Sequence, residues 1–511
     1  MINKTYTSRI SEYAGENGGR VLILFLLFLL SMYSLSNSGI NEMAMYLAIP
    51  VVVIAVYLIF SYKMLAFWTL FIINYTVMFL AKERLWPAIP ASLPNEMLEI
   101  VLIAVAAIDL KDTRFEDLAN LMILALFGWC VFCTLEVLND SCGLGINIPA
   151  WFTGIRLMAF QLLYAGIVFQ LYINSPERVY QLLKAWAFCS IFAVYWAWKQ
   201  KNIGWTQGES AWLFAAGHYR QHMVNGIIRY FSCFTDAANF GIHMAAAGAA
   251  FSIIAITNKV RKNKIFFSII GLLCIWGMFQ SGTRTAMFCL IAGFMVFLVL
   301  SKSVKIIVPV SIILGLFVAM LMFTNIGQGN NQIRRMRSAF NKNDASANVR
   351  DINKATIAKY MKEIPWGIGI GIFESDIPAR NKFKRLSQIP PDSEYVFIWV
   401  RTGVIGISCF LILNAIMLLG ACTTVFFKIG NRSLMGIGAA WCAAFTAIHL
   451  GGYANQILMQ FPNIVIFYGG LSTVYLYPSI EQKFNEYEAK QLEEEEEKKR
   501  LKLEKKLAKR V

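Results

Sequence analysis

The chain has 511 residues, of which 57% are apolar and only 15% charged, and its mean hydropathy is +0.54. An ordinary soluble domain is roughly a quarter charged, so these values exclude a large aqueous enzyme, a disordered chain and a disulfide scaffold. They predict a polytopic membrane protein. The net charge of +16 would suggest nucleic-acid binding in a soluble protein. Here positive cytoplasmic loops explain part of that charge, so no nucleic-acid partner is expected.

Apolar runs follow one another along the whole chain, and most are near the ~20 residues that cross a bilayer. The fourteen cores are 19–36, 43–60, 64–81, 96–110, 118–138, 153–173, 179–198, 237–257, 265–281, 284–301, 305–324, 394–427, 433–450 and 454–477. The run 394–427 is long enough to begin as a helix protruding above the membrane. The predicted fold is all-α: a transmembrane helical bundle of about 14 spans, eleven within 1–324 and three within 394–477.

Basic residues set the predicted orientation, because they fall in alternate short loops. Examples are Lys63, Arg178, Lys259, Lys302 and Lys428. With fourteen spans, these loops share the side of both termini, which predicts a cytoplasmic N-terminus and C-terminus. The long segments 199–236 and 325–393 would then face outward.

The charged tail, 478–511, is expected to form an exposed cytoplasmic helix. Residues 482–511 show no apolar face that the membrane domain could pack, so the sequence predicts that they are dispensable for catalysis.

The outer loop, 325–393, contains a stretch with helical periodicity. Over 351–364, the side chains of Ile357, Tyr360, Met361 and Ile364 share one face, and lysines flank it. This pattern predicts an amphipathic helix suited to the membrane surface, which Pro365 would end. The glycine-rich stretch 367–371 is interpreted as a tight backbone turn.

The histidines and cysteines show no metal pattern. His218 and His222 are spaced i, i+4 but lack an apparent third ligand, which favours solvated loop histidines over a metal site. Most cysteines lie in apolar runs and are expected to pack there. A disulfide between Cys142 and Cys233, which lie in polar segments on one predicted side, stays open. No metal and no cofactor are predicted.

Arginines at the outer edges of apolar runs are the candidate binding residues. Arg229 opens the stretch Arg-Tyr-Phe-Ser, Arg284 lies in Ser-Gly-Thr-Arg-Thr, and Arg350 precedes the amphipathic stretch. Arginine near apolar depth is costly and usually has a partner or ligand. A cluster of forked guanidinium groups can bind a diphosphate. The alternative is snorkelling to lipid headgroups, and for Arg284 function is favoured.

Two carboxylates end the outer loop, in Pro390-Pro391-Asp392-Ser393-Glu394. Asp392 could accept a proton from an attacking hydroxyl, or Asp392 or Ser393 could cap the following helix. Both readings stay open. Glu394 is the alternative base, but two residues along a helix place it ~200° away from Asp392. Only one of the two carboxylates should therefore face the arginines.

Five motifs occur in a fixed order around the outer loop. They are Ala237-Ala238-Asn239-Phe240, Ser281-Gly282-Thr283-Arg284-Thr285-Ala286, Asn348-Val349-Arg350, Pro365-Trp366-Gly367-Ile368-Gly369 and the stretch from Tyr395 to Gly406. Over about residues 200–475 the chain resembles the O-antigen ligase and O-antigen polymerase superfamily of bacterial inner-membrane enzymes.

The resemblance implies a metal-independent glycosyltransferase of the GT-C type. Its donor would be a glycan on undecaprenyl diphosphate, and its acceptor a second glycan or a lipid. It maps diphosphate binding onto Arg229, Arg284 and Arg350. Membrane lipids and other polysaccharide-assembly proteins are the further expected partners.

Family ligases carry His-Asn-x-Tyr where this chain has Asp392-Ser393-Glu394-Tyr395, which favours a polymerase over a ligase. Asp392, Arg284 and Arg350 are thus the expected catalytic residues. A lipid-linked oligosaccharide flippase is the alternative from another class. A flippase would need no long outer loop and should show internal repeats, and none is seen.

Overall fold

The computed structural model describes residues 18–37, 54, 57–85, 90, 92–109, 115–224, 226–337 and 345–508. The chain divides into two compact units, 1–67 and 68–511. In the first unit, α2 (Gly18–Asn37) is an uninterrupted apolar helix that contains no acidic residue. Its predicted span is confirmed as a helix. The functional site lies entirely in the second unit.

The prediction of an all-α fold is confirmed. Among the described residues, the only strands are β1 (Met223–Val224) and β2 (Ile227–Ile228), which pair as one short antiparallel hairpin. Eight described helices have the length and hydropathy to cross a membrane, and two apolar helices are shorter. The run 43–60 lies mostly outside the described residues, so the total of about fourteen spans stays a prediction.

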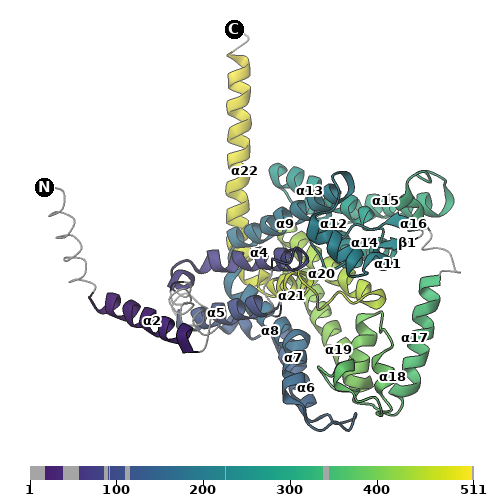
Figure 1. The fold of residues 1–511 in the computed structure, drawn as a ribbon. Helices are drawn as coiled ribbons and strands as arrows, with labels where there is room; N and C mark the ends of the chain where they lie inside the picture. The colour runs from purple at the N-terminus through teal and green to yellow at the C-terminus, as the bar shows by residue number, and fades with distance from the viewer. Residues whose placement is uncertain are drawn as a thin grey trace. The chain divides into compact units, whose positions relative to one another are not determined.

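The helices that match the predicted runs can be followed in Figure 1. In chain order they are α4 (Lys63–Lys82), α5 (Leu93–Ile108), α6 (Leu121–Leu135), α7 (Ile148–Ile155) continuing into α8 (Gln161–Tyr172), α9 (Pro176–Asn202), α12 (Ala237–Thr257), α13 (Arg261–Gln280), α14 (Arg284–Leu300), α15 (Val304–Phe323), α19 (Glu394–Thr423), α20 (Arg432–Ala454) and α21 (Asn463–Val474). Short helices occupy the segments between them: α10 (Gln207–Ser210), α11 (Tyr219–His222), α16 (Asn331–Arg337) and α18 (Lys384–Ser387).

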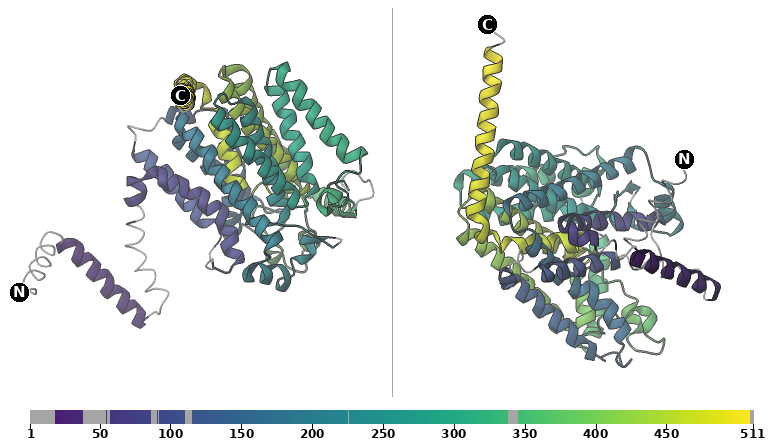
Figure 2. Two further views of the ribbon diagram at one scale, coloured as in Figure 1. Left: turned by 90° about the horizontal axis from the view of Figure 1, so that it is seen from above. Right: turned by 90° about the vertical axis from the view of Figure 1, so that its left-hand side faces the viewer.

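The centre of the second unit is α12, which packs against α13, α14 and α20. In Figure 1 and Figure 2 the teal helices α12, α13 and α14 lie side by side. Small residues make this possible: a Cβ added to Gly248 would lie 2.9 Å from Ile275 Cγ1, and one on Gly293 3.0 Å from Ala249 Cβ. Close approach through small residues is the usual basis of helix packing in lipid, where burying apolar surface against protein gains little over lipid.

Helix α19 is broken within its length, at Gly403, whose φ is 67° and ψ −170°. The break leaves backbone carbonyl groups without helical partners, and the glycine-rich stretch 367–371 donates to them. Ile368 N donates to Val400 O (2.9 Å), and Gly369 N donates to Arg401 O (3.0 Å). The tight turn predicted there is confirmed, with positive φ at Gly369. The long run 394–427 is therefore two helical pieces, and the second piece, with its extension to Lys428, can by itself cross a bilayer.

The amphipathic helix of the outer loop is present as α17 (Ala345–Met361), but its predicted location is wrong. The apolar face, with Ile357 and Met361 and the following Ile364, packs in one cluster with Phe383 and Val400. That face is covered by the protein's own α18 segment and α19. It is therefore not available to a membrane surface, because hydrophobic periodicity does not reveal which partner covers a face.

The sequence predicts that the tail is an exposed helix with no apolar face that packs on the membrane domain. This prediction is wrong for the first turns of the helix. Helix α22 (Tyr477–Leu507) buries Tyr477, Ile480 and Phe484 completely or nearly so. Phe484 stacks on Tyr180 of α9 at a centroid distance of 5.6 Å. Beyond Glu495 the helix is exposed, and Figure 1 shows this end projecting away from the other helices of its unit.

Three carboxylates, spaced seven residues apart on α22, join loops that the charge pattern placed on one side. Glu481 accepts from the backbone N–H of Gly430 (2.7 Å). Glu488 pairs with Lys259 (2.9 Å). Glu495 accepts from the backbone N–H of Lys262 (3.0 Å). The loops before α13 and α20 thus lie at the same end, as predicted, while the side of the membrane they face stays a prediction.

All ten cysteines are free thiols, so no disulfide joins Cys142 and Cys233. Cys142 packs in the cluster beneath α17, whereas Cys233 is buried next to Ser232.

Candidate functional site

A cavity of about 520 Å³ lies where the 199–236 segment, the α13–α14 turn, α17 and the start of α19 meet. The charged groups in its lining are Arg220, Arg229, Arg284, Arg335, Arg350, Asp236 and Asp392. The fold therefore brings together the three arginines that the sequence singled out. Five arginines against two carboxylates give the cavity a positive field, which favours a multiply charged anion.

Arg229 is fixed in the cavity wall by three hydrogen bonds. Its Nε donates to Ser281 O (3.3 Å), and its two terminal nitrogens donate to Thr283 Oγ1 (2.9 Å) and to Gln221 O (3.1 Å). Burial, with Arg335 close by, lowers the pKa of Arg229 to about 10. The guanidinium is therefore still charged at neutral pH, held among like charges that an anion would relieve.

The Ser281-Gly282-Thr283 turn places Arg284 as the first residue of α14. The turn rests on α12, since a Cβ on Gly241 would lie 2.1 Å from Ser281 Oγ. Arg284 lines the cavity, and the N-terminus of α14 adds partial positive charge there.

Arg335 of α16 reaches the same turn, and its Nε donates to Gly282 O (2.7 Å). Sequence reasoning missed both Arg335 and Arg220. Neither lies at the edge of an apolar run, so only tertiary packing reveals their place in the cavity.

Asp392 also lines the cavity, and its backbone is left-handed, with a φ of +53°. Aspartate adopts this conformation more readily than most residues other than glycine. Its Oδ2 accepts from Asn353 Nδ2 at 2.8 Å. Asn353 lies one turn after Arg350 on α17, so this helix delivers both a cavity arginine and the partner of Asp392.

Ser393 occupies the N-cap position of α19, as one of the two helix-cap interpretations predicted, whereas Asp392 does not. The Ser393 side chain makes no capping hydrogen bond. Its Oγ instead donates to Gly452 O (3.1 Å), at the end of α20.

Glu394 turns away from the arginines, and of the two predicted carboxylates only Asp392 lines the cavity. Glu394 is 3% exposed, and its carboxylate accepts from the backbone N–H of Leu458 at 2.9 Å. It thereby holds the loop after α20, which contributes Asn455 and Gln460 to the cavity wall. Its role as an alternative base stays a prediction.

The prediction of solvated histidines is wrong for His222, which is 2% exposed and lines the cavity. Its Nδ1 lies 3.0 Å from His218 O, and its ring packs against Trp212 and Phe231. Burial lowers the pKa of His222 to about 4, so the imidazole is neutral at pH 7. Its burial comes from the 205–231 segment folding on itself, which the i, i+4 spacing does not reveal.

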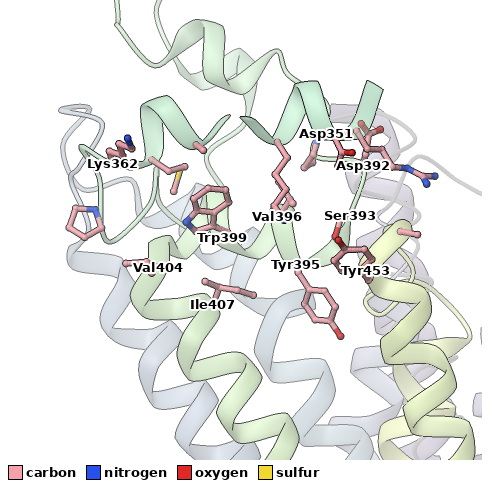
Figure 3. Close-up of a pocket in the computed structure, with 17 residues that line it drawn as sticks. Asp351, Lys362, Asp392, Ser393, Tyr395, Val396, Trp399, Val404, Ile407 and Tyr453 are labelled. Atoms are coloured by element: carbon pink, nitrogen blue, oxygen red, sulfur yellow. The ribbon is translucent and has the colours of Figure 1, made fainter. Parts of the chain in front are cut away.

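A second cavity, an apolar groove of about 850 Å³, runs between α17 and α19. It shares Arg350, Pro391 and Asp392 with the arginine cavity, so the two adjoin. Figure 3 shows Asp392 and Asp351 near one end, while Trp399, Val404 and Ile407 lie along α19. The groove thus extends from the charged groups past the break at Gly403, toward the membrane-crossing part of α19.

Residues 269–411 match the family model described as O-antigen ligase. The matched segment contains the turn before α14, all of α17 and the start of α19. It therefore includes Arg284, Arg350 and Asp392, together with most of the groove.

The resemblance to the O-antigen ligase and polymerase superfamily is thus confirmed over this segment. The O-antigen ligase domain supplies most of the charged wall, while Arg229 and His222 come from the segment before it. With the long apolar helices, the domain supports a multi-pass membrane protein and glycan transfer of the O-antigen ligase type. No curated protein matches the chain.

Proposed function

We propose that the protein is a membrane glycosyltransferase that polymerises undecaprenyl-diphosphate-linked oligosaccharide repeats of a surface polysaccharide. It would act on the outer face of the bacterial inner membrane. The observation that carries this proposal is that the apolar groove adjoins the arginine cavity, with Arg350 and Asp392 in the walls of both. A lipid diphosphate has the same two parts, an anionic head and a long hydrocarbon chain.

The donor would bind with its diphosphate among the arginines. Arg284 and Arg350 line the cavity from two different helices, and Arg229 completes its wall. Forked, charge-assisted hydrogen bonds from these groups suit phosphate oxygens. The isoprenoid chain would follow the groove, where Val396, Trp399 and other apolar side chains would remove it from water, at about 25 cal/mol per Å² of apolar surface buried.

The reaction replaces one C–O bond at the anomeric carbon with another. A hydroxyl of the acceptor glycan attacks this carbon, and the bond to the diphosphate breaks, with its electron pair leaving on the phosphate oxygen. The arginines stabilise that developing charge. Asp392 takes the hydroxyl proton. Asn353 holds Oδ2 of Asp392, so the other carboxylate oxygen is available to the acceptor.

A weak base is sufficient for this step. A transition state with oxocarbenium character makes the attacking hydroxyl more acidic, so a carboxylate can accept its proton. No step calls for a metal ion, because the arginines provide the positive charge.

An O-antigen ligase, which would transfer the glycan to a lipid acceptor, is the second candidate. The description of the matched family favours it. It shares the donor site and the chemistry, and it differs only in the acceptor. The Asp-Ser-Glu-Tyr stretch in place of the family histidine motif favours the polymerase. A flippase, the candidate from another class, receives no support from the O-antigen ligase domain.

The test is the polymer length on glycan extracted from cells in which each variant replaces the chromosomal copy. Asp392→Asn should abolish polymer and accumulate single repeats on the lipid diphosphate, while membrane insertion stays normal. Arg350→Lys keeps the charge but loses the fork, and we expect a loss of about 10²-fold or more, typical of removing one donor to a developing charge. Glu363→Gln is the matched control, because Glu363 is an exposed carboxylate near the end of α17 that lines neither cavity.

Full-length polymer from Asp392→Asn would refute its role as the base. Near-normal transfer by Arg350→Lys would mean that Arg350 does not bind the leaving group. Cells that lack the gene for this protein distinguish the two candidates. If they accumulate single repeats on the lipid diphosphate, the protein is a polymerase. If they accumulate long polymer that is not transferred to its lipid acceptor, it is a ligase.

A further inference from the structure

Helices α4, α5 and the α7–α8 pair enclose a polar cluster, none of whose members lines the arginine cavity. Its members are Asn74, Asn95, Glu96, Glu99, Arg156 and Gln161. The five other than Arg156 are at most 5% exposed, and Glu99 and Gln161 are fully buried. Asn74 and Gln161 lie near the middle of helices long enough to cross a membrane. Charged and amide groups at such depth are costly unless their hydrogen bonds are satisfied.

Hydrogen bonds join the cluster across the helices. Arg156 Nε donates to Glu96 Oε2 at 2.7 Å, and Gln161 Nε2 donates to Glu99 Oε2 at 2.9 Å. Asn74 Nδ2 donates to Asn95 Oδ1. Arg156 begins a π-helical turn, Arg156–Phe160, between α7 and α8. Such insertions frequently mark functional sites, because they shift the side chains that follow.

The cluster contains several buried polar atoms with no hydrogen-bond partner among the described residues. They are Asn74 Oδ1, Asn95 Nδ2, Glu96 Oε1, Glu99 Oε1 and Gln161 Oε1. Four of the five are oxygen acceptors, and the one donor, Asn95 Nδ2, faces the Glu99 carboxylate, so it can satisfy at most one of them. Buried polar atoms in folded proteins almost always have a partner, so these oxygens are expected to bind a donor or a cation.

The charges indicate what that species is. The cluster contains two carboxylates and one guanidinium, and the ion pair of that guanidinium is with Glu96 and not with Glu99. The other titratable groups that face Glu99 or its neighbours are Tyr164 and Cys130, neither of which brings a positive charge. Ordered water alone would satisfy the acceptors but would leave one negative charge buried. A small cation would meet both requirements, and oxygen ligands suit a hard cation.

We propose that this cluster binds one small monovalent cation, a proton or Na⁺, at Glu99, with Gln161 as a further oxygen ligand. A proton would turn one oxygen of Glu99 into a donor. Na⁺ would instead be coordinated by the free oxygens directly. The bound cation would stabilise the packing of α5 against α8.

The experiment measures thermal unfolding of the full chain in lipid nanodiscs. Melting temperature is followed against NaCl, with choline chloride keeping ionic strength constant, at pH 6 and pH 8. A Na⁺ site predicts a saturable rise of about 2–4 °C with NaCl at pH 8, smaller at pH 6 because protons compete. A proton site predicts no Na⁺ effect but a lower melting temperature at pH 8 than at pH 6.

Glu99→Gln removes the charge at nearly constant shape and should abolish either response. Glu116→Gln, at an exposed carboxylate of the 3₁₀ turn before α6, is the matched control and should respond as the original chain does. A melting temperature that depends on neither Na⁺ nor pH in the original chain would overturn the proposal, even if Glu99→Gln fails to fold. An identical response in Glu99→Gln would overturn it too. The measurement follows stability and not transfer, so its outcome is independent of the proposed function.

Discussion

Phe484 provides the sharpest test of how the tail is held. Its side chain is fully buried, and its ring stacks on Tyr180 with 21° between the ring planes. Tyr180 is itself fixed, since its hydroxyl accepts from Asn258 Nδ2 at 2.9 Å. The substitution Phe484→Ala therefore leaves a cavity between α22 and α9 that rigid neighbours cannot fill.

The expected loss follows from that burial. Replacing a fully buried phenylalanine by alanine costs about 3–5 kcal/mol. Unfolding entropy of ~2.1 cal/mol/K per residue gives about 1 kcal/mol per degree for a chain of this length. Phe484→Ala should therefore lower the melting temperature by roughly 3–5 °C. The neighbouring contacts of Glu488 and Glu495 add to this loss if the tail detaches.

The assay measures thermal unfolding of the purified full chain. Unfolding is monitored by tryptophan fluorescence and by the height of the monomer peak in size-exclusion chromatography after heating. Leu501→Ala is the matched control, because Leu501 lies on the same helix and is 45% exposed. Its change should stay within about 0.5 kcal/mol, as for surface substitutions in general.

Two truncations extend the test. A chain ending at Glu496 keeps Phe484, Glu488 and Glu495 with their contacts to other helices, and loses only exposed ion pairs within α22, so it should behave as the full chain. A chain ending at Glu481 should lose stability. Equal melting temperatures for Phe484→Ala and Leu501→Ala would refute the docking of α22.

Three further predictions concern metal, orientation and pH. Glycan transfer should survive EDTA, because arginines supply the positive charge; loss of transfer that Mg²⁺ restores would contradict this. Reporter fusions at Arg380 and Lys490 should report opposite sides of the membrane, and a shared side would contradict the predicted topology. Because burial holds the pKa of His222 at about 4, the unfolded chain takes up a proton that the folded chain does not bind as pH falls from ~6.5 toward 4. The free energy of unfolding should therefore decrease over that window, and it should decrease less in His222→Gln. If His222→Gln loses as much stability in acid as the original chain, His222 is not a buried neutral imidazole.

The sequence by itself determined the fold class and the places where function could reside. Thirteen of the fourteen apolar runs coincide with described helices, because the length of hydrocarbon to be crossed sets the length of such runs. Arg229, Arg284 and Arg350 stood out because a guanidinium at the edge of an apolar run has few tolerable environments. Of Asp392 and Glu394, only Asp392 lines the cavity. The helical step of 100° per residue does not account for this, because Asp392 precedes α19, which begins at Glu394.

Only the tertiary structure decided which faces meet. Periodicity assigned an apolar face to α17 but could not say that α18 and α19 cover it in place of lipid. The bond from Asn353 to Asp392 joins positions 39 residues apart, and that from Arg229 to Thr283 joins positions 54 residues apart. The docking of α22 likewise depends on partners in α9, α13 and α20. Local sequence sets the polarity of each surface, whereas the partner of that surface is chosen by packing between segments that are distant along the chain.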